Sequence, residues 1–235
     1  MNEFQIGVAK LFHKQVQQER IEFFGDDDLI KWMPEFQRDD ASCMCPPFMG
    51  KKYRKCGLIV IAINPGGGNE TNNTRNYGDS LLYPLLHDFK SLQSDEADFY
   101  WEKIVPRFKD SMMSYPIYEK IMGILNASKT TLDDICFFNF LPYRGRANNY
   151  PKGKREMSYI IPKCRENFVK PVLDFLQPSL VVTFGKQVDI YINEFWDDFQ
   201  FERVSWNRGR APRPSVLQER ADSLGKLEKW SLEKL

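Results

Sequence analysis

Short, unbroken runs of apolar residues alternate along this chain with longer stretches in which apolar residues recur at helical spacing. Three runs, at residues 58–63, 135–140 and 180–184, predict strands that are buried on both faces of a sheet. Residues 199–206 alternate between apolar and polar side chains and predict a fourth strand. Helices are predicted at residues 4–24, 29–36, 81–89, 99–108, 117–125, 164–176 and 185–196 and in the C-terminal tail.

Strands that are separated by helices are typical of an α/β fold. We expect a three-layer αβα architecture with a central, mostly parallel sheet of about four strands flanked by helices. The 235 residues are 42% apolar and 28% charged, which is ordinary globular composition. We expect a single domain over residues 1–235, with residues 1–50 as an N-terminal helical extension.

The net charge of +1 gives the chain no overall attraction to nucleic acids or membranes, so anion binding has to come from a local patch. No apolar run approaches the roughly 18 residues that a membrane span needs. Five cysteines are an odd number for a disulfide framework. We therefore expect a cytoplasmic protein with no membrane partner.

Three of the predicted strands end in polar or basic loops. Residues 64–69 read Asn-Pro-Gly-Gly-Gly-Asn, residues 139–146 contain one asparagine and two arginines, and residues 208–215 contain three arginines. Because ligands of open α/β sheets bind beyond the carboxyl ends of the strands, we expect these loops to form one cleft. Amides and arginines suit a base or another planar polar group, with phosphates on the arginines.

The glycine turn at residues 64–69 does not match the common nucleotide-binding motifs. It lacks the lysine of a P-loop and the third glycine of the dinucleotide fingerprint. Its backbone N–H groups can still hold phosphate, which leaves a nucleotide-binding α/β protein of another class as one interpretation.

Four sequence features, taken in order, carry a resemblance to a known family. Asn-Pro-Gly at residues 64–66 follows the first apolar run, and Asn139 lies at the end of the second. Residues 164–187 combine a helix, a proline, a strand and a glycine, and residues 213–217, Arg-Pro-Ser-Val-Leu, precede a Lys-Trp pair at 229–230. Together they resemble the motifs of the uracil-DNA glycosylase superfamily, in the Asn-Pro-Gly variant of its mismatch-specific and single-strand-selective branches.

The resemblance implies a protein that binds uracil-containing or mismatched DNA, flips out uracil or a related damaged base, and excises it by hydrolysis of the N-glycosidic bond. It assigns Asn139 to the hydrogen-bonding edge of the base, Asn64 to the attacking water and Arg213 to the departing base. An amide cannot take a proton, so Asn64 would orient the water rather than act as a base. Further base contacts would come from Pro65, Gly66 and Tyr77, and DNA contacts from Arg144, Arg146, Arg208, Arg210 and Ser215.

The last motif departs from the pattern of the family that it resembles. That motif usually begins with histidine, which stabilises the departing base, whereas this chain has Arg213. The two histidines of the chain, His13 and His87, lie on predicted helices outside the motifs. The alternative to an enzyme is therefore a binding module of the same fold that holds a base or nucleic acid without turnover.

The cysteines leave one further alternative open. We expect no cofactor, but one branch of the superfamily holds an iron–sulfur cluster, and the positions of Cys43, Cys45 and Cys164 are similar to its ligand positions. Cys136 or Cys56 would have to supply the fourth thiolate. Here the first pair is Cys-x-Cys instead of Cys-x-x-Cys, and Tyr143 stands at another ligand position. Four thiolates have to converge to hold such a cluster.

Overall fold

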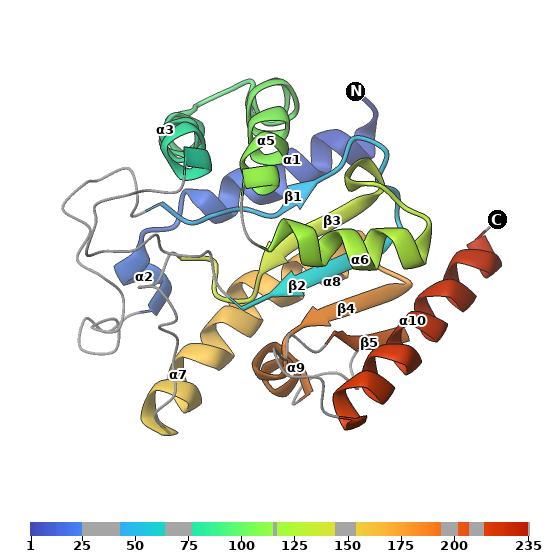
Figure 1. Cartoon of the computed structure of the whole chain (residues 1–235). Helices are drawn as coiled ribbons and strands as arrows, with labels where there is room; N and C mark the ends of the chain where they lie inside the picture. The colour runs from blue at the N-terminus through green and yellow to red at the C-terminus, as the bar shows by residue number, and fades with distance from the viewer. Residues whose placement is uncertain are drawn as a thin grey trace. The chain divides into compact units, whose positions relative to one another are not determined.

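The computed structural model describes residues 1–24, 43–63, 77–114, 117–143, 154–193, 202–206 and 214–234. These residues form an α/β fold around one five-stranded sheet with the strand order β1-β3-β2-β4-β5 (Figure 1). The strands are β1 Phe48–Met49, β2 Leu58–Ala62, β3 Ile135–Asn139, β4 Leu180–Phe184 and β5 Glu202–Trp206. The α/β class predicted from the sequence is thus confirmed, and the helix predicted at residues 29–36 lies outside the described residues.

The sheet is mixed but mostly parallel. β4 pairs in parallel with β2, where Leu58 is opposite Leu180, and with β5, where Leu180 is opposite Glu202. Every residue of β2, β3 and β4 is buried, as their unbroken apolar runs predict. The fifth strand, β1, is an addition to the prediction, because a two-residue strand is too short to show a period.

The lead-in around β1 runs antiparallel to the start of β3. Gly50 N–H donates to Ile135 O at 2.9 Å, and Lys52 N–H donates to Asp133 O at 2.8 Å. Residue numbers therefore increase along one segment and decrease along its partner, as in an antiparallel pair. A Cβ added to Gly50 would lie 2.3 Å from the backbone of Leu132 and of Asp133. Glycine is therefore the residue that this close backbone approach requires.

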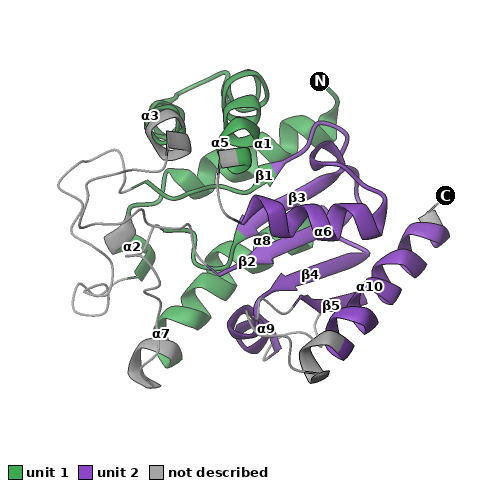
Figure 2. Cartoon of the chain, viewed as in Figure 1, with its two compact units in different colours: residues 1–48, 64–115, 139–175 green, residues 49–63, 116–138, 176–235 purple. Residues whose placement is uncertain are grey.

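The chain divides into two compact units, each assembled from three separate segments (Figure 2). Unit 1 contains residues 1–48, 64–115 and 139–175, and unit 2 contains residues 49–63, 116–138 and 176–235. A single cut in the chain cannot separate the two units, because each is discontinuous in sequence. Residues 1–48 belong to unit 1, and the single domain predicted over residues 1–235 stays a prediction.

Unit 1 is mainly helical. Its first helix, α1, starts with a capping box in which Gln5 N–H donates to the Asn2 side chain at 2.9 Å and Asn2 N–H donates to the Gln5 side chain at 3.1 Å. The one helix predicted at residues 4–24 is two helices, because the chain leaves the helix at residues 17–19. The α-helices of unit 1 are α1 Glu3–Val16, α2 Arg20–Phe24, α3 Tyr77–Ser91, α4 Glu96–Phe99, α5 Val105–Ser114, α7 Lys154–Cys164 and α8 Lys170–Leu176.

Two π-helical turns, η4 Tyr100–Ile104 and η6 Arg165–Val169, join helices in unit 1. Each closes with an i→i+5 hydrogen bond from the residue before a proline, since Val105 N–H donates to Tyr100 O and Lys170 N–H donates to Arg165 O. A proline inside an α-helix lacks a donor and its ring clashes with the carbonyl four residues earlier. The wider turn gives that carbonyl room, so both predicted helices continue past their prolines.

Unit 2 carries the remaining helices, which are α6 Tyr118–Ser128, the short 3₁₀ turn η5 Leu132–Asp134, α9 Lys186–Asn193 and α10 Pro214–Lys234. The last helix is tied to the sheet by side-chain hydrogen bonds. Ser223 Oγ donates to Ser205 O at 2.8 Å, and Trp230 Nε1 donates to Ser179 Oγ at 2.9 Å. The helix α10 itself confirms the helical tail that was predicted from the sequence. Within the described ranges, no helix combines the length and the apolar character that a membrane crossing requires.

Candidate functional site

Asn139 is the last residue of β3, at the carboxyl end of the strand. It is 8% exposed, and its neighbours Phe138 and Phe140 are buried. None of the other described residues forms a hydrogen bond with its carboxamide. Asn139 is not among the described residues with a fully buried polar atom that lacks a partner, so its amide still reaches solvent. A largely buried amide that is open to solvent and bonded to no described residue is available to a ligand, which favours a binding role over a packing role.

The turn that follows Asn139 is fixed by the N-terminal part of unit 1. Cys45 N–H donates to Pro142 O at 2.8 Å, and the buried Tyr143 donates its hydroxyl hydrogen to Gln18 O at 3.2 Å. The Tyr143 ring lies 5.5 Å from each of the two phenylalanine rings of α2, between centroids. Residues 142 and 143, which follow the strand end, are therefore held in place by contacts within unit 1. Sequence reasoning missed this pairing, because no periodicity connects residue 18 with residue 143.

The end of β4 carries a second polar cluster, in unit 2. Thr183 is fully buried and donates from Oγ1 to Asp189 Oδ1 at 3.1 Å, and the same Asp189 oxygen lies 3.6 Å from Arg203 Nε. Gly185 follows with φ of 104° and donates its N–H to Trp206 O at 3.0 Å. The predicted order of strand, glycine and helix is confirmed, and each polar group of this cluster has a protein partner.

The structure does not test the predicted cleft as a whole. Tyr77 is the first residue of α3 and Ser215 lies near the start of α10, but their side chains lie outside the described part of the chain. The other predicted site residues that lie outside the described residues are Asn64, Pro65, Gly66, Arg144, Arg146, Arg208, Arg210 and Arg213. Asn139 is thus the one predicted base-binding residue whose surroundings are described, and the convergence of the others on it stays a prediction.

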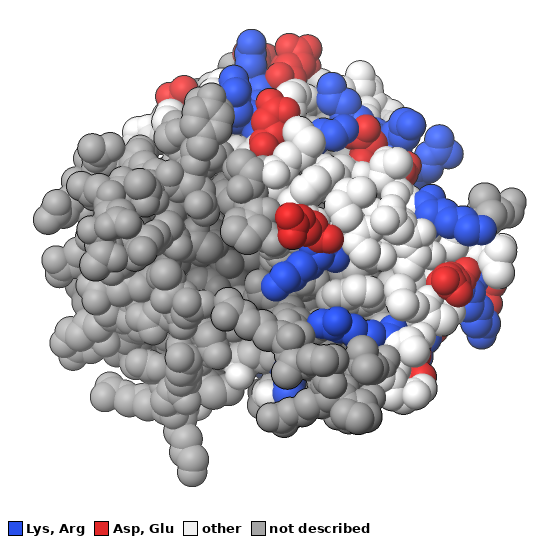
Figure 3. All heavy atoms as spheres, viewed as in Figure 1, with Lys and Arg blue, Asp and Glu red and all other residues white. Residues whose placement is uncertain are grey.

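Acidic and basic side chains are interspersed on the described part of the face shown in Figure 3. This mixture agrees with the net charge of +1. All of the arginines predicted to contact DNA lie outside the described residues. The DNA contacts predicted for these arginines therefore stay a prediction.

The cysteines are buried apart from Cys56. Burial raises the pKa of the Cys136 and Cys164 thiols, which favours the neutral thiol over the thiolate that binds metals. Cys43 and Cys45 are also buried, at 2% and 6% exposure. Across the described ranges, which include all five cysteines, no group of three or more His, Cys, Asp or Glu side chains is placed to hold a metal ion.

Comparison with known proteins adds no family to these observations. No protein-family model matches the sequence, and no curated protein matches it either.

Proposed function

We propose that this protein is a DNA glycosylase that binds uracil or a related damaged base at the carboxyl end of β3 and hydrolyses its N-glycosidic bond. The observation that carries the proposal is the carboxamide of Asn139, which is 8% exposed and has no hydrogen-bond partner among the described residues. The order of the sequence motifs around Asn139 supports the same assignment.

The chemistry of an amide suits this substrate. A carboxamide presents one acceptor and one donor in a plane. Uracil presents the complementary pair on its edge, since N3–H is a donor and O4 is an acceptor. Asn139 O would accept from N3–H, and Asn139 N–H would donate to O4. Extrusion of the base from the duplex costs a few kcal/mol, and these bonds together with stacking would offset that cost.

Cleavage needs charge stabilisation on both fragments. Positive charge grows on the sugar and negative charge on the departing base as the N-glycosidic bond breaks. Arg213 would stabilise the base as an anion, because a guanidinium keeps its proton at every physiological pH. Asn64 would orient the water that attacks the sugar carbon, and the N–H groups of the glycine turn would hold the uracil O2. The proton that the water loses would pass to solvent, and the departed uracil anion would take up a proton from solvent.

A second function, a base-binding module without turnover, is favoured by the same arginine. Arginine cannot give up a proton to the leaving group, and it binds phosphate well in a bidentate manner. In that case Asn139 would still bind the base while Arg213 held the DNA backbone.

The experiment compares wild-type protein with Asn139→Ala and with the matched control Asn126→Ala, which changes an exposed asparagine of α6. Each protein is incubated with a labelled oligonucleotide containing one uracil, single- or double-stranded, and abasic sites are cut with alkali. We expect strand scission with the wild type and the control, and a loss of about a hundredfold or more with Asn139→Ala.

Binding is measured in parallel by fluorescence anisotropy. Binding of the uracil oligonucleotide without scission would leave the binding module as the function. If the protein neither cuts the uracil oligonucleotide nor prefers it to a thymine oligonucleotide, both forms of the proposal are wrong.

A further inference from the structure

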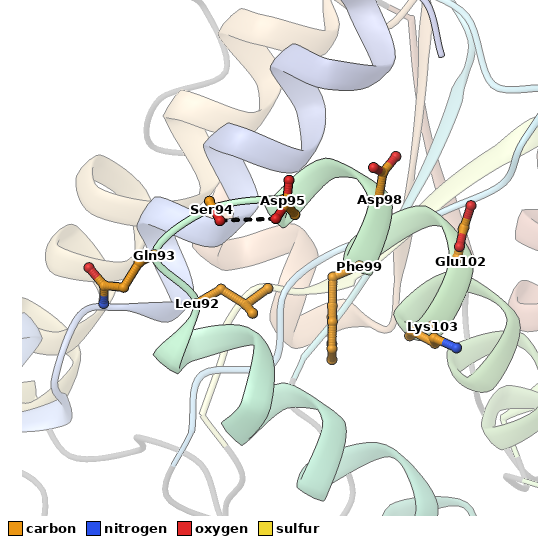
Figure 4. Close-up of a pocket in the computed structure, with 8 residues that line it drawn as sticks. All are labelled: Leu92, Gln93, Ser94, Asp95, Asp98, Phe99, Glu102 and Lys103. Carbon is orange, nitrogen blue, oxygen red and sulfur yellow. Dashed lines mark hydrogen bonds between the residues drawn. The ribbon is translucent and has the colours of Figure 1, made fainter.

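A hollow of about 320 Å³ lies in unit 1, where α3 ends and the chain turns into α4 and η4 (Figure 4). Its lining side chains come from nearby positions in the sequence, so the hollow does not depend on the placement of distant parts of the chain. They are Leu92, Gln93, Ser94, Asp95, Asp98, Phe99, Glu102 and Lys103.

The floor of the hollow is apolar. Leu92 and Phe99 are both half-buried, and they extend toward the same space in Figure 4. Phe99 stacks on the fully buried Phe89, with 6.0 Å between ring centroids and 12° between ring planes. The stacking on Phe89 thus holds the Phe99 ring in place, and the exposed face of the Phe99 ring can contact another apolar group.

The rim of the hollow is acidic. Asp95, Asp98 and Glu102 are exposed, and the lining contains one cationic side chain, Lys103. Asp95 accepts a hydrogen bond from Ser94 Oγ at 3.0 Å, and none of the three carboxylates forms an ion pair with another described residue. Three negative charges and one positive charge give the lining a net charge of −2, although the whole chain carries +1.

We propose that this acid-rimmed hollow docks a basic peptide segment of a partner protein. One apolar side chain of the segment enters between Leu92 and Phe99, and lysines or arginines on either side of it face Asp95, Asp98 and Glu102. An apolar anchor in a small pocket with charges at its rim is a common mode of peptide recognition. Nucleic acids and anionic lipids carry the wrong sign of charge for this rim. The proposal does not depend on the glycosylase activity.

The test uses a fluorescein-labelled peptide in which a central Phe-Leu pair is flanked by two lysines on each side, and measures anisotropy with the full chain. Two comparison peptides replace either the lysines by glutamates or the Phe-Leu pair by serines. We expect the first peptide to bind, and either replacement to weaken binding about tenfold or more. Binding should also weaken as salt rises through about 0.1 M, because the rim charges are exposed.

A pair of charge-reversal variants locates the site. Asp98→Lys/Glu102→Lys should weaken binding of the basic peptide about tenfold or more. The control Glu119→Lys/Glu228→Lys makes the same change in net charge at exposed positions of unit 2 and should bind within about twofold of wild type. Equal loss in both variants, no binding of the basic peptide, or equal binding of the serine peptide would each overturn the proposal.

Discussion

Replacing Asn139 by leucine should increase the stability of this protein and abolish the proposed binding of uracil. Leucine has the same number of side-chain heavy atoms as asparagine and no polar group. A fully buried amide without partners costs about 1–3 kcal/mol, and Asn139, which is 8% exposed and whose amide still reaches solvent, should cost no more than the lower value. We expect Asn139→Leu to raise the free energy of unfolding by about 1 kcal/mol. For a chain of this size, that corresponds to an increase of roughly 2–4 °C in Tm.

The assay is urea-induced unfolding followed by tryptophan fluorescence, with Asn126→Leu as the control at an exposed position. The control should change the free energy of unfolding by less than about 0.5 kcal/mol. A gain in stability together with lost uracil binding would show that the carboxamide is kept for a ligand. A loss of about 2 kcal/mol or more would refute the reasoning, because it would mean that the amide forms hydrogen bonds that hold the fold together.

The remaining predictions concern packing, the turn after β3 and the buried thiols. Gly50→Ala should cost about 3 kcal/mol or more in urea unfolding, because the added Cβ would lie 2.3 Å from backbone atoms; normal stability would show that the backbone can move apart. Tyr143→Phe removes the hydroxyl that donates to Gln18 O and should cost about 1 kcal/mol, with faster hydrogen exchange in the turn after β3; unchanged exchange would mean that the hydroxyl does not hold the turn. The pKa values of Cys136 and Cys164 are raised by burial, so the unfolded thiols ionise first. Stability should therefore be full below about pH 8.5 and fall above it by up to about 1.4 kcal/mol per pH unit for each thiol. Urea midpoints measured across that range check the direction, and a rise in stability would contradict it.

The sequence was most informative where burial was complete. The strand predicted at residues 180–184 coincides with β4 Leu180–Phe184, because an apolar run that is buried on both faces leaves one clear pattern. The helices at residues 81–89 and 117–125 are confirmed as parts of α3 and α6 for a related reason, since one apolar stripe at helical spacing marks each of them.

Other features depend on partners that are distant in the chain. The bond from Tyr143 to Gln18 O joins residues 125 positions apart, and the antiparallel contact of Gly50 with Ile135 has no local signal. The candidate site was predicted from the polar loops at the strand ends and from motif order, and Asn139 is the predicted base-binding residue whose surroundings the structure describes. Its burial agrees with the strand predicted at residues 135–140. The sequence could not indicate that no described residue bonds its amide, because that depends on the packing around the strand end.

The two π-helical turns have a consequence for how insertions and deletions act on this chain. An i→i+5 turn contains one residue more than an α turn, so the side chains beyond η4 and η6 are rotated by about 100° from the direction that an unbroken α-helix would give them. A variant could lose one residue from such a turn and carry alanine in place of Pro106 or Pro171. The π turn would then become an α turn, and the two parts of the helix would form one continuous α-helix. We therefore expect these two positions to accept a one-residue deletion, with the proline exchanged, without a change in which side chains face the core.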